Sequence, residues 1–202
     1  MFKEKGKPIA AFILMVVILI GSWYLAHLTG LIVFKSVGSV IRFLAITTSL
    51  MGFQLIISAM PGTPFEFVDH GLQLSIIAFI SVITLYGNNA LGNYANENLF
   101  LALVLTLVLM GLTLYTNVKE KRENAPVSQG WRLINFCLGI ISIQIYIIVS
   151  IAQEIQSWSF SLFNSLILLC GYIYIDWIQY PEDSIFWYIM QDKLHILKQP
   201  HK

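Results

Sequence analysis

Residues 99–116 read LFLALVLTLVLMGLTLYT, a stretch without a charged side chain. A transmembrane helix needs about 20 predominantly apolar residues to cross roughly 30 Å of hydrocarbon. Five further apolar stretches follow the same pattern, although one of them is shorter. The six predicted helices cover residues 9–28, 43–60, 72–86, 99–116, 133–152 and 160–179. The sequence therefore predicts an all-α, polytopic membrane protein with about six transmembrane helices.

The composition also favours lipid over water as the solvent of this chain. Of the 202 residues, 57% are hydrophobic and 11% are charged, whereas soluble domains carry roughly 25% charged residues. A soluble protein of this size leaves about a third of its unfolded surface exposed, so it could not hide so many apolar side chains. The predicted partner is therefore the lipid bilayer. A net charge of +1 creates no strong field that would attract nucleic acid.

Basic residues predict the orientation, because lysine and arginine accumulate in cytoplasmic loops. With six helices and a cytoplasmic N-terminus, only Lys35 and Arg42 of the 12 basic residues lie outside. The cytoplasmic segments, including a polar loop at 119–129, then contain Lys3, Lys5, Lys7, Lys119, Lys121, Arg122, Arg132, Lys193, Lys198 and Lys202. Both ends of the chain are thus predicted to be cytoplasmic. Short loops without an N-x-Ser/Thr glycosylation sequence favour a bacterial inner membrane.

The C-terminal segment differs in pattern from the rest. Residues 1–180 are predicted to form the transmembrane domain, and residues 181–202 a cytoplasmic tail. In the tail, apolar residues recur at spacings of three and four: Phe186, Ile189, Met190, Leu194 and Leu197. This spacing predicts an amphipathic helix at the membrane interface.

Two features near the N-terminus affect the helix count. The apolar run at 9–28 is longer than a signal-peptide core and is interpreted as an uncleaved first helix. Residues 30–42 are compatible with a loop, an interfacial turn or a continuation of that helix. Tryptophans near predicted helix ends are expected to anchor the membrane interface: Trp23, Trp131 and Trp158.

Asp176 is an acidic residue inside a predicted transmembrane helix, about one turn from its cytoplasmic end. Ionisable side chains inside a bilayer are costly, so they are paired or functional. Arg132 begins the preceding helix at a similar depth and is the expected partner. We interpret the two as a structural ion pair, with a proton-coupling or ion-coupling role as the alternative.

Amide side chains within the fifth and sixth predicted helices form a second set of candidates: Asn135, Gln144 and Asn164. At such depths amides bond across helices, worth about 0.6–2 kcal/mol each, and substrate binding is the alternative. Gly139, Ser142 and Gly171 are expected to let these two helices approach closely. The candidate intramembrane polar site consists of Asp176, Arg132, Asn135 and Gln144.

No cofactor, metal site or enzymatic activity is predicted. Cys137 and Cys170 lie in apolar stretches without CxxC spacing, which favours packing over metal binding. Asp69 and His70 belong to a predicted loop whose spacing matches no metal motif, and His27 is expected to be structural. The sequence also lacks paired acids in the spans and the HExxH motif, which argues against an intramembrane enzyme.

Two functions remain as hypotheses. A small-solute carrier, or the membrane subunit of one, is favoured by the six helices, the mid-depth amides and Asp176. A non-catalytic interaction protein, such as an assembly factor, a secretion-complex subunit or an immunity protein, is favoured by the sparse polar residues and the amphipathic tail. The second hypothesis requires a membrane protein partner, and a homo-oligomer is compatible with both.

Overall fold

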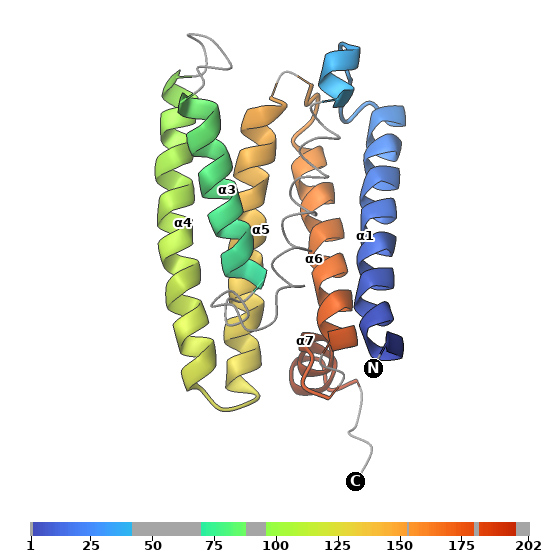
Figure 1. Cartoon of the computed structure of the whole chain (residues 1–202), viewed down its shortest axis with the longest axis vertical. Coiled ribbons are helices and arrows are strands. Elements are labelled where there is room, and N and C mark those ends of the chain that lie inside the picture. The colour runs from blue at the N-terminus through green and yellow to red at the C-terminus, as the bar shows by residue number, and fades with distance from the viewer. Residues whose placement is uncertain (1, 42–69, 88–95, 153, 180–181, 197–202) are drawn as a thin grey trace.

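The computed structural model describes residues 2–41, 70–87, 96–152, 154–179 and 182–196. The elements are α1 (Phe2–Leu28), α3 (His70–Gly87), α4 (Asn96–Arg122), α5 (Val127–Ser150), α6 (Ser159–Gln179), α7 (Ile185–Trp187) and the π-helix η3 (Tyr188–Lys193). Figure 1 shows α1, α3, α4, α5 and α6 lying side by side, with the N-terminus and α7 at one end of the bundle. In these parts of the chain the structure contains helices and no strand, which confirms the all-α class.

The long helices overlap the predicted ones wherever the chain is described, but their ends differ. α4 continues to Arg122, so the polar loop predicted at 119–129 is reduced to the turn before Val127. Lysine, glutamate and arginine have high helix propensity, and basic side chains in a last turn interact favourably with the helix dipole. Polarity alone therefore does not end this helix. The helix predicted at 43–60 lies outside the described residues.

In the described parts of the chain, two helices are long and apolar enough to cross a membrane, α4 over Asn98–Arg122 and α5 over Val127–Ser150. The apolar parts found in α1, α3 and α6 are shorter, namely Val16–Leu28, His70–Tyr86 and Ser159–Tyr174. The two longer helices are consistent with membrane association. The complete arrangement of six spans stays a prediction.

Glycines bring α3 and α5 into close contact. A Cβ atom added to Gly71 of α3 would overlap Asn135 of α5, and one added to Gly139 of α5 would overlap the backbone of Gly71. The hydroxyls of Ser75 and Ser142 lie 3.1 Å apart across the same two helices. Small residues at a helix crossing let the backbones approach. Gly139 and Ser142 thus pack against α3, and the prediction that they face the sixth helix is wrong, because spacing along one helix does not specify its neighbour.

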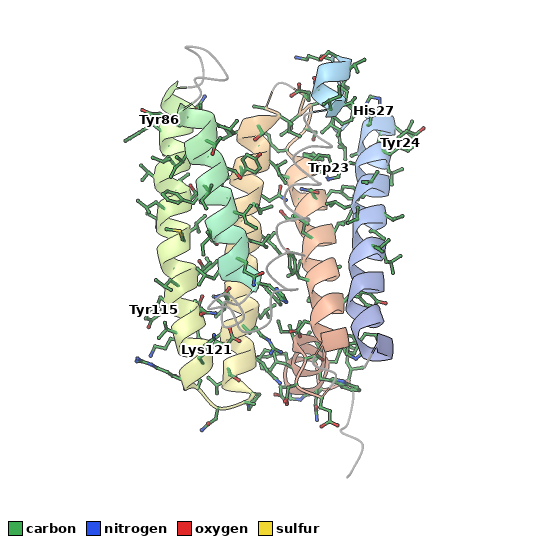
Figure 2. The ribbon with its side chains drawn as sticks, in the orientation of Figure 1. Trp23, Tyr24, His27, Tyr86, Tyr115 and Lys121 are labelled. Atoms are coloured by element: carbon green, nitrogen blue, oxygen red, sulfur yellow. The ribbon has the colours of Figure 1, made fainter. Side chains whose placement is uncertain are left out.

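Trp23 joins α1 to α6. Its side chain is 1% exposed, its indole Nε1 donates to Oδ1 of Asn164 at 2.6 Å, and its ring packs edge-on against Phe160 with centroids 5.6 Å apart. Figure 2 shows Trp23 directed toward α6, whereas Tyr24 points away from the bundle. A buried indole requires a hydrogen-bond acceptor, which Asn164 provides. Trp23 is therefore part of the helix packing and not the interfacial anchor predicted from its place near a helix end.

The segment after α1 folds over the end of the bundle instead of continuing the helix. Gly30 has a φ of 73°, in the left-handed region that glycine adopts without steric cost. Ile32 then pairs with Ile155 in an isolated antiparallel bridge, and Ser39 Oγ donates to Glu154 Oε1 at 2.7 Å. The described part of this segment is thus a turn followed by a short helical stretch at residues 37–41, and it ties the end of α1 to the linker between α5 and α6.

The C-terminal segment forms a shorter helix than its apolar spacing predicts. α7 begins after Ser184, whose Oγ accepts a hydrogen bond from the N–H of Trp187 at 3.3 Å. The π-helix ends at Lys193, and Leu194, predicted to lie on the apolar face of a longer helix, is 53% exposed. His195 follows with a φ of 52°, a left-handed conformation that does not continue a helix. Leu197 lies outside the described residues.

Candidate functional site

The predicted ion pair between Arg132 of α5 and Asp176 of α6 is present. Nε of Arg132 lies 3.3 Å from Oδ1 of Asp176, and the two side chains are 14% and 1% exposed. Nη2 of Arg132 also donates to Oδ2 of Asp176 at 3.3 Å. A carboxylate buried to this degree requires a counter-charge and hydrogen bonds to offset its loss of hydration. The pairing inferred from similar depth on neighbouring helices is therefore confirmed.

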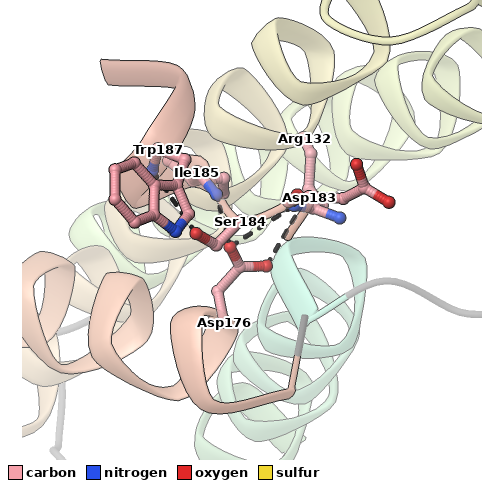
Figure 3. Close-up of polar contacts among 6 residues, drawn as sticks. All are labelled: Arg132, Asp176, Asp183, Ser184, Ile185 and Trp187. Carbon is pink, nitrogen blue, oxygen red and sulfur yellow. Dashed lines mark hydrogen bonds and ion pairs between the residues drawn. The ribbon is translucent and has the colours of Figure 1, made fainter. Parts of the chain in front are cut away.

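The same pair anchors the start of the C-terminal segment, as Figure 3 shows. Oδ2 of Asp176 accepts a hydrogen bond from the backbone N–H of Ile185 at 2.6 Å, and Nη2 of Arg132 donates to the backbone carbonyl of Asp183. Ile185 itself is fully buried. The pair thus connects α5, α6 and α7. Asp176 therefore contacts both Arg132 and the backbone of Ile185, an arrangement that a structural role explains.

Asn135 connects α5 to α4. Its side chain is fully buried, and Nδ2 donates to the backbone carbonyl of Thr113 at 2.8 Å and to Oγ1 of Thr116 at 3.0 Å. Together with Trp23 and Asn164, these bonds confirm that amides join neighbouring helices in this protein. Such interhelical bonds are worth about 0.6–2 kcal/mol each in a membrane.

Gln144 of α5 differs from Asn135, whose Oδ1 is also buried without a described partner but whose Nδ2 is paired. Its side chain is 6% exposed, yet neither Nε2 nor Oε1 has a hydrogen-bond partner among the described residues. Nδ2 of Asn164 is likewise buried without a partner there, although its Oδ1 accepts from Trp23. Buried polar groups are normally paired, and each exception requires an explanation.

Gln144 and Asn164 lie at the same depth in the bundle. The Arg132–Asp176 contact fixes the register of the antiparallel pair α5 and α6, and each amide is twelve residues from it (132 to 144 and 164 to 176). At a rise of 1.5 Å per residue, this is about 18 Å from the ion pair toward the other end of the bundle. We call the level defined by Gln144 and Asn164 the amide level.

The remaining candidates have packing roles or no ligand-like arrangement. His70 begins α3 and stacks on Phe136 with ring centroids 5.9 Å apart, so it belongs to the helix interface and not to the predicted solvated loop. Nδ1 of His27 lies 3.3 Å from the carbonyl oxygen of Ile32. Cys137 and Cys170 are both free thiols. Within the described ranges, no group of three His, Cys, Asp or Glu side chains could hold a metal ion.

The chemistry available at the amide level is that of neutral hydrogen bonding. Among the described residues, Gln144 has an unpaired donor and an unpaired acceptor, Asn164 has an unpaired donor, and Trp23 of α1 donates to Asn164. Comparison of the chain with protein-family models, curated proteins and solved structures finds no match.

Replacing Trp23 with phenylalanine is expected to lower the stability of the folded protein. Phenylalanine keeps the aromatic contact with Phe160 but leaves Oδ1 of the buried Asn164 without its donor, at about 1–3 kcal/mol. The thermal midpoint in detergent should fall clearly. Trp158→Phe is the matched control. Trp158 is 78% exposed, so its replacement should change the thermal midpoint little. Equal midpoints for the two variants would contradict the assigned role of Trp23.

Proposed function

We propose that this protein is a six-helix integral membrane protein of a bacterial inner membrane, with both ends cytoplasmic, and that it carries a small, neutral, polar solute or is the membrane subunit of such a carrier. The amide level is the proposed solute site. The polar atoms of Gln144 and Asn164 that are buried without a partner among the described residues are the observation on which the proposal rests.

Exposed apolar side chains support insertion into a bilayer. α4 exposes large apolar residues along most of its length, including Leu101, Val108 and Tyr115, and α1 does so at Val17 and Leu25. Soluble monomers rarely expose continuous apolar patches larger than a few hundred Å². Lipid tails cover apolar side chains without cost, whereas their exposure to water is unfavourable. Membrane insertion therefore explains the exposed apolar side chains of α1 and α4.

The distribution of charge along the bundle supports cytoplasmic ends. The last turn of α4 contains Lys119, Lys121 and Arg122. Lys121, the N-terminus and α7 lie at the same end of the bundle (Figures 1 and 2). Basic residues gathered at one end match the cytoplasmic side of a membrane protein.

The amide level supports a neutral and polar solute. An unpaired buried amide atom costs about 1–3 kcal/mol, and a solute with both donors and acceptors would remove this cost on binding. Residues 141–147 of α5 and 161–167 of α6 contain no charged side chain, so the site offers no counter-charge to an ion. A molecule with the hydrogen-bonding character of an amide or a polyol fits these groups.

Solute flux into liposomes tests the proposal. Purified protein would be reconstituted into liposomes. The shrinking and swelling of the liposomes in urea, acetamide and glycerol would be measured by stopped-flow light scattering. Liposomes that contain wild-type protein should take up at least one of these solutes faster than empty liposomes do. Gln144→Leu should reduce that flux by roughly tenfold, since a tenfold change equals about 1.4 kcal/mol, close to the upper range for one hydrogen bond.

Asn117→Leu provides the control for removing a buried amide. Nδ2 of Asn117 is also buried without a described partner, but the residue follows Thr116, which contacts Asn135 of α5, and Asn135 is nine residues along α5 from Gln144. Solute flux through the Asn117→Leu protein should stay near the wild-type value. A Gln144→Leu protein that is folded and transports as fast as the wild type would refute the amide level as the solute site.

A non-catalytic interaction protein is the second candidate. It is favoured by α4, which buries a smaller share of its apolar length than α5 and therefore offers a long helical face to another transmembrane helix. Purification from native membranes separates the two candidates. Absence of flux for every tested solute, together with stoichiometric copurification of an unrelated membrane subunit, would favour the interaction protein.

A further inference from the structure

An apolar groove runs between α1 and α6. It has a volume of about 420 Å³ and is lined by aliphatic and aromatic side chains, among them Leu14 and Ile18 of α1 and Leu166 of α6. These three side chains are 45–52% exposed, so the groove opens sideways and not into the bundle. Gly171 lies in its wall, and the absence of a side chain there leaves room between the two helices.

The lining residues Gly171 and Tyr174 belong to the last part of α6, and α6 ends at the end of the bundle that holds the N-terminus (Figure 1). On α6 the groove reaches Tyr174, whose ring lies 6.3 Å from that of Trp177. Both residues are partly exposed, and paired aromatic residues near a helix end are typical of the lipid headgroup level. The groove thus connects the apolar interior of a membrane with the interface on one side.

The start of α1 supplies positive charge at this end. Lys3, Glu4, Lys5 and Lys7 occupy its first turns, and three lysines against one glutamate leave a net charge of +2. Along the backbone, Lys7 precedes Leu14 by about 10 Å at 1.5 Å per residue. Basic residues near the membrane surface attract anionic headgroups. An apolar groove below a basic helix end is complementary to a molecule with apolar chains and an anionic head.

We propose that the groove between α1 and α6 binds one acyl chain of an anionic phospholipid from the cytoplasmic leaflet, with the headgroup beside the lysines that begin α1. The proposal rests on the membrane location in the proposed function and is independent of solute transport. The bound lipid stabilises the packing of α1 on α6, because it covers apolar side chains that these helices do not cover themselves.

Native mass spectrometry of the full-length protein tests this proposal. Protein would be reconstituted into vesicles of equal parts phosphatidylglycerol and phosphatidylcholine, extracted in mild detergent, and scored for retained phospholipid. Wild-type protein should retain one phosphatidylglycerol in clear excess over phosphatidylcholine. Gly171→Phe fills the groove and should reduce retention about tenfold, which corresponds to about two buried methylene groups.

Gly111→Phe is the matched control, because a Cβ atom added at Gly111 of α4 meets no atom within 4 Å. It should retain lipid as the wild type does. Ile18→Trp fills the groove from α1 and serves if Gly171→Phe does not fold. Replacing Lys3, Lys5 and Lys7 with glutamine should remove the preference for phosphatidylglycerol.

Three results would overturn the proposal. The first is equal retention by folded groove-filled variants and Gly111→Phe, and the second is equal retention of the two lipids by wild-type protein. The third is occupation of the groove by another polypeptide. Gln144→Leu should retain lipid normally, so a failure of lipid binding is distinguishable from a failure of the solute site.

Discussion

Replacing Gly139 with leucine is expected to prevent recovery of folded protein. A Cβ atom at this position would overlap the backbone of Gly71, so α3 and α5 would have to separate. Overpacking of a core typically costs about 1–3 kcal/mol when side chains can adjust, and backbone atoms cannot move aside as side chains do. Separation would also break the contact between Ser75 and Ser142.

Alanine variants give the sharper comparison. Glycine to alanine in an open helix position stabilises the helix by about 1 kcal/mol. Gly111→Ala should therefore be neutral or stabilising, because nothing lies within 4 Å of the added atom. Gly139→Ala should destabilise despite the same gain in propensity. Folded yield by size-exclusion chromatography and thermal midpoints measure the difference, and similar behaviour of the two alanine variants would argue against the close crossing of α3 and α5.

Replacing Asp176 with alanine is the second change with a large expected effect. It leaves Arg132 without its counter-charge and removes the acceptor for the N–H of Ile185. Breaking a buried ion pair by removing one partner costs about 3–5 kcal/mol. We expect lower folded yield and a lower thermal midpoint. Asp183→Asn is the control, because the contact with Arg132 uses only the backbone carbonyl of Asp183.

A double-mutant cycle then tests whether the two charges act together. The Arg132→Ala and Asp176→Ala double variant should lose much less stability than the sum of the single variants, because coupled residues are not additive. Additive losses of stability would show that Arg132 and Asp176 do not stabilise the protein as a pair. Asp176→Asn keeps an oxygen acceptor for Ile185 and should lie between wild type and Asp176→Ala in stability, while solute flux stays unchanged.

The helices and the ion pair were predictable from the sequence because both depend on position along the chain. Runs of apolar residues identify α3, α4, α5 and α6, and equal distance from predicted helix ends relates Arg132 to Asp176. The buried face of α1 could also be predicted from the sequence, because its members recur at helical spacing: Leu19, Ser22, Trp23 and Ala26. Trp23 was misassigned because nearness to a helix end was given more weight than this spacing.

Other features depend on which elements meet in space. The partner of Gly139 could not be read from α5, because a small residue indicates a close approach without identifying the neighbour. The end of the tail helix at Lys193 likewise depends on the local backbone at His195, where the apolar spacing continues beyond the helix. The amide level became apparent only when the Arg132–Asp176 contact fixed the register of α5 against α6.

The central claim is that the chain crosses a membrane six times with both ends in the cytoplasm, and cysteine accessibility in oriented membranes tests it most directly. After replacement of Cys137 and Cys170 with serine, single cysteines would be introduced at Lys5, Asn93, Asn124 and Gln199. We predict that an impermeant maleimide labels Lys5→Cys, Asn124→Cys and Gln199→Cys only from the cytoplasmic side, and Asn93→Cys only from the opposite side. Labelling of Asn124→Cys from the outer side, or of all four positions from one side, would contradict the six-span arrangement.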